Sequence, residues 1–118
     1  MILTEEKFKE LGEKYGLDVE ISPSILPNLK GNIVWYNFPD YNPKDTHFWF
    51  IEFETATNKI QYAEGYSYNP YAHRIIGEKL KEKECVTFEE LEEILKKSLK
   101  DYKECKMKNE LEHISRDF

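Results

Sequence analysis

The strongest constraint on the fold is a β-forming run over residues 46–55. It holds five large apolar side chains, which are Phe48, Trp49, Phe50, Ile51 and Phe53. Aromatic and β-branched residues favour strands, because they pack well on a pleated surface. Residues 33–38 form another β run, and residues 56–59 have the pattern of a hairpin turn that leads into a strand at 60–66. The sequence therefore predicts an antiparallel meander of three strands.

Before this sheet, the chain has the pattern of a short helix followed by a short strand. Thr4 is a suitable N-cap for a helix over residues 5–15, where apolar residues recur at helical spacing. Residues 17–21 then alternate apolar and acidic side chains, which is typical of a half-buried strand. We expect this strand to lie at an edge, in a sheet of three to four strands.

After the sheet, the sequence predicts two helices. Asn69 and Pro70 are suitable N-cap and N1 residues, so we expect a helix over residues 70–83. Thr87 and Glu90 form a capping box that begins the last helix. The expected fold is α+β in the order α-β-β-β-α-α, with the helices on one face of an antiparallel sheet.

The apolar stripe of the last helix changes direction along its length. A first stripe ends at Cys105. A second stripe, made of Met107, Leu111 and Ile114, is rotated from the first by about half a turn around the helix axis. A straight helix cannot bury both stripes against one sheet, so we expect a bend or break near residues 106–109, or a different contact for the last ten residues. Residues 106–118 are predicted to be a flexible tail or a segment that docks a partner.

The charge balance narrows the class of partner. The 118 residues include 17 lysines and arginines against 23 acids, which gives a net charge of −6. Phosphate affinity comes mostly from Lys and Arg, so this balance argues against direct nucleic-acid binding and favours a basic partner. The length fits a single domain over residues 1–118.

Membrane and export signals are not recognisable in the sequence. No apolar run approaches the roughly 18 residues of a membrane span, and the charged N-terminus lacks the apolar core of a signal peptide. Cys85 and Cys105 are too far apart for a disulfide if the chain between them is mostly one helix. We therefore expect a reduced, cytoplasmic protein.

The predicted sheet is both aromatic and acidic. Of the 17 aromatic residues, 12 lie between Trp35 and Tyr71. Alternation along the central strand predicts one set of side chains that face the helices: Trp49, Ile51 and Phe53. The opposite set is Phe48, Phe50, Glu52 and Glu54. Exposed rings edged with carboxylates suggest a protein-binding surface, unless a loop such as residues 22–31 covers the rings.

We expect the partner-binding residues to be acids and tyrosines of the sheet and its loops. Tyrosine gives a large, rigid contact area at low entropic cost, which is why interfaces favour it. The predicted contacts are Asp40, Tyr41, Asp45, Glu52, Glu54, Glu64, Tyr66 and Tyr68.

Catalytic and metal-binding motifs are not recognisable. Glu52 and Glu54 would lie about 7 Å apart along a strand, within the range of an acid–base pair, but many ordinary strands carry such a pair. His47, His73 and His113 lack the spacing of metal ligands, and the scattered glycines form no phosphate-binding loop. We expect no metal and no cofactor, and a small enzyme that uses Glu52 and Glu54, or His47, stays as an alternative.

In size, charge and expected order of elements, the chain resembles the small acidic α+β inhibitors of phages and mobile elements, such as anti-CRISPR proteins. It also resembles the immunity proteins that neutralise basic nuclease toxins. In both classes an acidic surface is steered onto a basic nucleic-acid cleft, and aromatic side chains add affinity. The resemblance implies a non-enzymatic inhibitor of a larger basic protein. The alternative is a self-associating scaffold that forms a homodimer through Met107, Leu111 and Ile114.

Overall fold

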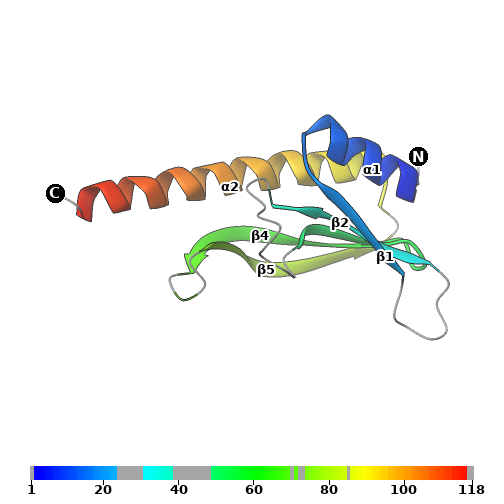
Figure 1. Ribbon diagram of the computed structural model, residues 1–118. Helices are drawn as coiled ribbons and strands as arrows, with labels where there is room; N and C mark the ends of the chain where they lie inside the picture. The colour runs from blue at the N-terminus through cyan, green and yellow to red at the C-terminus, as the bar shows by residue number, and fades with distance from the viewer. Residues whose placement is uncertain are drawn as a thin grey trace.

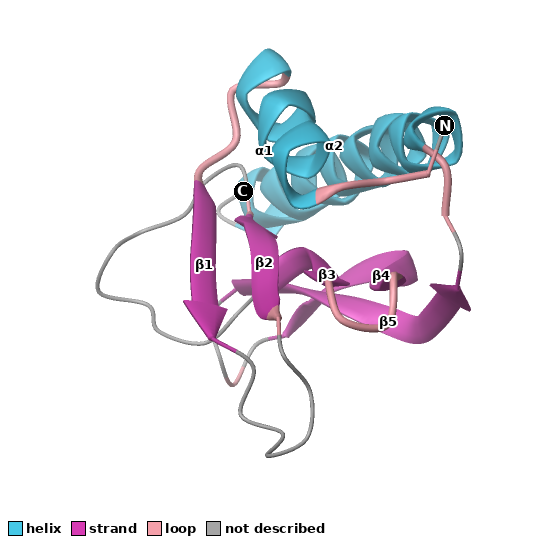
Figure 2. Ribbon diagram, turned by 90° about the vertical axis from the view of Figure 1, so that its right-hand side faces the viewer, coloured by secondary structure: helices cyan, strands magenta, loops and turns pink. Residues whose placement is uncertain are grey.

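A computed structural model describes residues 2–23, 31–38, 49–69, 71, 74–84 and 86–116, with only the backbone for Trp49, Arg74 and residues 111–116. Five strands form one antiparallel sheet in the order β1-β2-β3-β4-β5, and both helices lie over the same face of it (Figure 1; Figure 2). The elements are α1 (Glu5–Lys14), β1 (Val19–Pro23), β2 (Asn32–Asn37), β3 (Trp49–Glu54), β4 (Lys59–Asn69), β5 (Arg74–Glu84) and α2 (Phe88–Arg116). The predicted α+β class is confirmed, with five strands in place of three to four.

The helix predicted over residues 70–83 is wrong, because this segment continues the sheet. Strand β5 pairs with β4 in one register, from Lys59↔Glu84 to Asn69↔Arg74. Asn69 Oδ1 accepts the N–H of Tyr71 at 2.8 Å, as an N-cap would, but strand β5 begins at Arg74 in place of a helix. The observed order is therefore α-β-β-β-β-β-α, with one helix after the sheet rather than two.

The sequence of β5 does contain a strand signal. Between Glu78 and Glu84, lysines alternate with glutamates and one leucine at the period of a strand. The same segment also places Ile75, Ile76 and Leu80 at helical spacing. Because the backbone of β5 is paired with that of β4, this long-range pairing decides between the two patterns.

Both helix starts follow their predicted caps. Thr4 Oγ1 accepts the N–H of Lys7 at 3.2 Å, and Thr87 Oγ1 accepts the N–H of Glu90 at 3.1 Å. The two starts are also joined to each other, because the N–H of Leu3 donates to the carbonyl of Val86 at 3.0 Å. The N-terminal segment is thereby fixed beside the first turn of α2.

Helix α2 continues without a break for 29 residues, so the first predicted alternative, a bend or break near residues 106–109, is wrong. A separate contact for the last ten residues stays a prediction. The helix contains neither proline nor glycine, and its Glu, Lys and Leu residues favour continuation. Its C-terminal end extends beyond the tip of the β4–β5 hairpin (Figure 1). Because the helix does not bend at the change of stripe, Met107 of the second stripe is 63% exposed.

Two groups of aromatic rings hold the helices on the sheet. Under α1, the Phe8 ring stacks on Tyr36, with centroids 4.0 Å apart, and on Phe53, at 5.4 Å. The Tyr36 hydroxyl also donates to the Phe8 carbonyl at 2.6 Å. Under α2, four rings are in mutual contact, with centroids 5.3 to 6.1 Å apart: Phe38, Phe50, Tyr66 and Tyr102. We call these four residues the ring tetrad.

A register shift in β3 corrects the prediction for Phe50. Tyr36 is opposite Ile51 and Asn37 is opposite Trp49, so Phe50 is an extra residue on its strand. Phe50 and Ile51 are consequently both buried, at 1% and 0% exposure, although they are neighbours in sequence. Phe50 contacts Tyr102 of α2, so it does not join the predicted exposed ring patch. Phe48 lies outside the described residues, as does the side chain of Trp49.

Gly12 lies at the closest approach of α1 to the sheet, which gives a first test of this packing. A Cβ at Gly12 would lie 2.6 Å from Cε1 of Tyr36 and 2.7 Å from Cγ2 of Val19. Gly→Ala within an exposed helix stabilises by about 1 kcal/mol. Here the methyl would force α1 away, so we expect Gly12→Ala to lower the free energy of unfolding by about 1–3 kcal/mol in urea denaturation.

The control for this substitution is Gly65→Ala, because a Cβ at Gly65 meets no atom within 4 Å. We expect the control to change the free energy of unfolding by less than about 0.5 kcal/mol. A Gly12→Ala protein that is more stable than the wild type would contradict the close contact.

Candidate functional site

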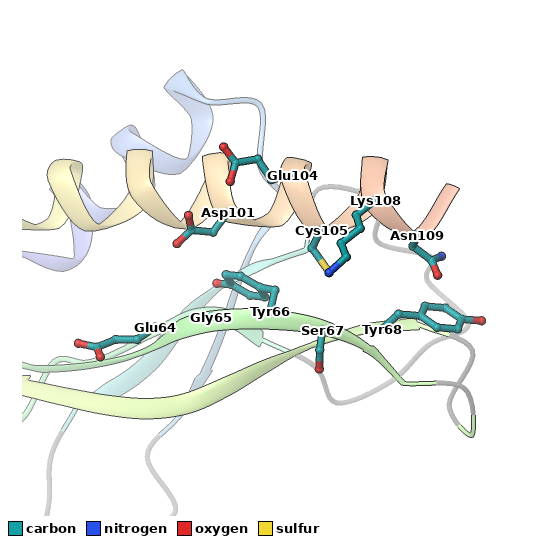
Figure 3. A pocket seen from close by; sticks show the side chains of 10 residues that line it. All are labelled: Glu64, Gly65, Tyr66, Ser67, Tyr68, Asp101, Glu104, Cys105, Lys108 and Asn109. Atoms are coloured by element: carbon teal, nitrogen blue, oxygen red, sulfur yellow. The ribbon is translucent and has the colours of Figure 1, made fainter. Parts of the chain in front are cut away.

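The predicted contact residues do not form one site. Phe53 stacks on Phe8 of α1, so its strand neighbours Glu52 and Glu54 lie on the face of the sheet opposite the helices, which we call the open face. Glu64, Tyr66 and Tyr68 lie on the helix side of β4 (Figure 3). The remaining predicted contacts lie outside the described residues: Asp40, Tyr41 and Asp45.

Register places the open-face side chains in two rows that cross all five strands. The first row, from β1 to β5, is Glu20, Trp35, Glu52, Gln61 and Glu82. The second row is Ser22, Ile33, Glu54, Lys59 and Glu84. Strands lie about 4.8 Å apart, so each row spans about 19 Å. The two rows together carry five carboxylates and one ammonium group.

The carboxylates are spaced so that no two are directly opposite each other in these rows. Acids come from β1, β3 and β5, whereas β2 and β4 contribute Trp35, Ile33, Gln61 and Lys59. Like charges directly opposite on neighbouring strands destabilise a sheet. Two strand spacings, about 10 Å, separate the acids within a row, which is near the screening length in physiological salt. The open face therefore carries a broad negative potential at a small folding cost.

Electrostatics single out Glu52 within the first row. Burial raises the pKa of the Glu52 carboxyl, the neighbouring Glu54 raises it further, and Lys59 opposes both effects. The Lys59 Nζ is 3.5 Å from Oε2 of Glu82, and Gln61 Nε2 also donates to Glu82 at 2.5 Å. These hydrogen bonds and the Lys59 charge lower the pKa of Glu82. Lys59 thus forms its ion pair with Glu82 of β5 and not with Glu52. Glu52 has no ion pair with a described residue.

Trp35 is the apolar centre of the first row. It is partly exposed, and its Nε1 donates to Oδ1 of Asn37 at 3.1 Å. Asn37 is only 2% exposed, so the hydrogen bond fixes the indole from a buried position. Register puts Glu20 and Glu52 directly opposite Trp35 on its two neighbouring strands. The open face therefore combines a fixed aromatic ring with carboxylates on both sides.

A groove on the helix side provides a second candidate surface. It has a volume of about 500 Å³ and lies between β4 and the C-terminal half of α2 (Figure 3). Glu64 and Asp101 lie toward one end of it, and Tyr68 and Asn109 toward the other. Lys108 reaches down from α2 between these ends, so the groove contains charges of both signs.

Tyr66 forms part of the groove wall but belongs mainly to the core. Its ring is one member of the ring tetrad, and burial raises the pKa of Tyr66 to about 12, with a smaller increase from Asp101. The nearby Ser98 hydroxyl acts in the opposite direction. A side chain that holds α2 on the sheet is less available for a partner. The groove is consequently a weaker match than the open face to a strongly basic ligand.

Sequence reasoning missed part of the open face. Local sequence patterns assign Trp35 to neither face of the sheet, and they predict Glu82 inside a helix and Glu84 beside it. The alternation of charges in β5 is the signal that could have placed both glutamates. Trp35 could have been placed beside Glu52 only from the register of β2 with β3.

Comparisons with protein-family models, curated proteins and solved structures found no match for the chain. Within the described residues, no three His, Cys, Asp or Glu side chains lie together in a way that could hold a metal ion. In the same part of the chain, neither helix has the length and apolar character needed to cross a membrane.

The raised pKa of Glu52 predicts a pH-dependent stability. Since folding favours the neutral carboxyl, its contribution is present below the ordinary pKa of 4.5 and is lost as the pH rises through the higher folded value. Glu52→Gln keeps the side chain neutral at every pH. We expect it to raise the free energy of unfolding at about pH 7 by less than about 1 kcal/mol, with no difference near pH 3.

Urea denaturation across this pH range measures the effect, and Glu20→Gln on the exposed edge strand is the matched control. A Glu52→Gln protein with the stability of the wild type at neutral pH would show that the Glu52 carboxylate is not disfavoured by its surroundings.

Proposed function

We propose that the chain is a non-enzymatic cytoplasmic protein that binds a larger basic protein through its open face and inhibits it. The observation that carries the proposal is the row in which Glu20 and Glu52 flank Trp35 on one face of the sheet. Protein interfaces combine an aromatic centre with a polar rim in this way. The net charge of −6 adds long-range attraction toward a basic partner.

The proposal gives a reason for keeping acids that weaken the fold. Glu52 is half-buried with no ion pair to a described residue, and Glu54 lies beside it, so ionisation of Glu52 is disfavoured in the isolated chain. A Lys or Arg side chain of a partner would remove this penalty on binding. Ionisable groups that are disfavoured in the free protein are concentrated at functional sites.

Nucleic-acid-handling proteins are the partner class that fits best. Their functional clefts are rich in Lys and Arg, which supply most of their affinity for phosphate. An acidic face about 19 Å across would cover such a cleft and compete with the nucleic acid. Inhibition then follows from occupation of the cleft and needs no catalytic group on the inhibitor.

The test is affinity capture from cell lysate on the immobilised protein, at low and at high salt, with identification of retained proteins by mass spectrometry. We expect capture of a basic nucleic-acid-handling protein that is weakened by salt, because counterions screen the charges. Glu52→Lys combined with Glu54→Lys should remove the captured protein while circular dichroism shows an unchanged fold.

The matched control combines Glu93→Lys and Glu110→Lys, two exposed positions on α2 that give the same change in net charge. The control should retain the partner at low salt. Equal capture by the Glu52/Glu54 variant and the wild type would reject the open face as the binding surface.

Self-association is the second candidate function, and the exposure of Met107 favours it. Met107 is 63% exposed on the part of α2 beyond the ring tetrad. The side chains of Leu111 and Ile114, which would complete the stripe, lie outside the described ones. If α2 pairs with a second copy, light scattering should give twice the mass of the chain, and a chain ending at Lys106 should be monomeric. A monomeric full-length chain would exclude this function.

A further inference from the structure

The surroundings of Trp35 define which basic side chain the open face can select. Glu20 and Glu52 are its direct cross-strand neighbours, and such neighbours have Cβ atoms about 4.5–5.5 Å apart. The hydrogen bond from the indole Nε1 to the buried Asn37 holds the ring in one orientation. A group that lies on this indole is therefore also within reach of a carboxylate.

The two basic side chains would use this arrangement differently. The guanidinium of arginine is planar, stacks on aromatic rings and donates two parallel hydrogen bonds to one carboxylate. The ammonium of lysine is a compact, strongly hydrated charge that cannot form such a paired contact. The arrangement of ring and carboxylate thus matches the shape of a guanidinium.

The one lysine of the two rows forms its ion pair away from Trp35. Lys59 forms its ion pair with Glu82 on β5. Glu82 is the last residue of the first row, at the opposite end from Glu20. Glu52 is desolvated and close to Glu54, with no ion pair to a described residue. A cation that binds at Trp35 consequently meets an uncompensated carboxylate in a partly buried position.

We propose that Trp35 and Glu52 form an arginine-selective site, in which a guanidinium stacks on the indole and donates two hydrogen bonds to the Glu52 carboxylate. The inference rests on the proposed function, because the arginine belongs to the basic partner. It adds the identity of the recognised side chain and assigns its selection to Trp35. Positions such as Glu54 then contribute attraction that does not distinguish arginine from lysine.

The experiment compares two capped peptides of equal charge, in which glycine alternates with either arginine or lysine, by calorimetric titration at low salt. We expect the arginine peptide to bind the wild-type protein about three- to tenfold more tightly. Trp35→Leu should abolish this preference and leave the affinity for the lysine peptide nearly unchanged. Tyr71→Leu is the matched control, because Tyr71 is 94% exposed and lies in the β4–β5 connection.

A third peptide tests the site without any substitution in the protein. Methylation of arginine keeps its charge but blocks paired hydrogen bonding. A peptide of methylated arginines should therefore bind the wild type about as weakly as the lysine peptide. This arm stays informative even where Trp35→Leu lowers the stability of the sheet.

The outcomes separate this inference from the proposed function. Equal binding of the arginine and lysine peptides, lost in the variant with Glu52→Lys and Glu54→Lys, would overturn the arginine site and leave the acidic face as the binding surface. Binding that is unaffected by that double variant would overturn both. Tight binding of the methylated peptide would overturn the paired hydrogen bonds to Glu52.

Discussion

The ring tetrad is the contact on which the arrangement of the molecule depends. Its four rings come from the residue after β2, from β3, from β4 and from α2, and each ring contacts the other three. Aromatic pairs of this kind contribute about 0.5–1.5 kcal/mol each beyond the burial of their area. Because the bulge at Phe50 turns an extra ring toward α2, the described apolar side chains of β3 gather on the helix side, namely Phe50, Ile51 and Phe53. In its two rows, the open face then carries Trp35, Ile33 and charged or polar residues.

Much of this fold could be predicted from local sequence, and the largest failure, strand β5, has a clear physical cause. The caps at Thr4 and Thr87 and the meander from β2 to β4 depend on neighbouring residues, and these predictions are confirmed. Strand β5 was wrongly predicted as a helix, because Asn69, Pro70 and the spaced isoleucines also fit a helix start. Only the pairing with β4 decides between the two, and this pairing is a long-range contact.

The candidate site was predictable only in part for the same reason. Alternation correctly placed Glu52 and Glu54 on the face away from the helices. It could not place Trp35 beside Glu52, because that contact depends on the register between β2 and β3. Glu64 and Tyr66 were grouped with the open-face acids, yet they lie on the other side of β4 (Figure 3). A site that crosses strands is a property of register, which a bulge changes by one residue.

Lys59 is the one lysine in the two rows, and its position determines where the open face attracts a cation most strongly. Lys59 lies directly between Glu54 and Glu84 and reaches Glu82, so it reduces the negative potential over β4 and β5. Over β2 and β3, Glu52 and Glu54 lie beside the neutral residues Trp35 and Ile33. Partial burial of Glu52 strengthens the field there, because less water screens it. The strongest attraction and the fixed indole therefore coincide, although they arise from different features of the sequence.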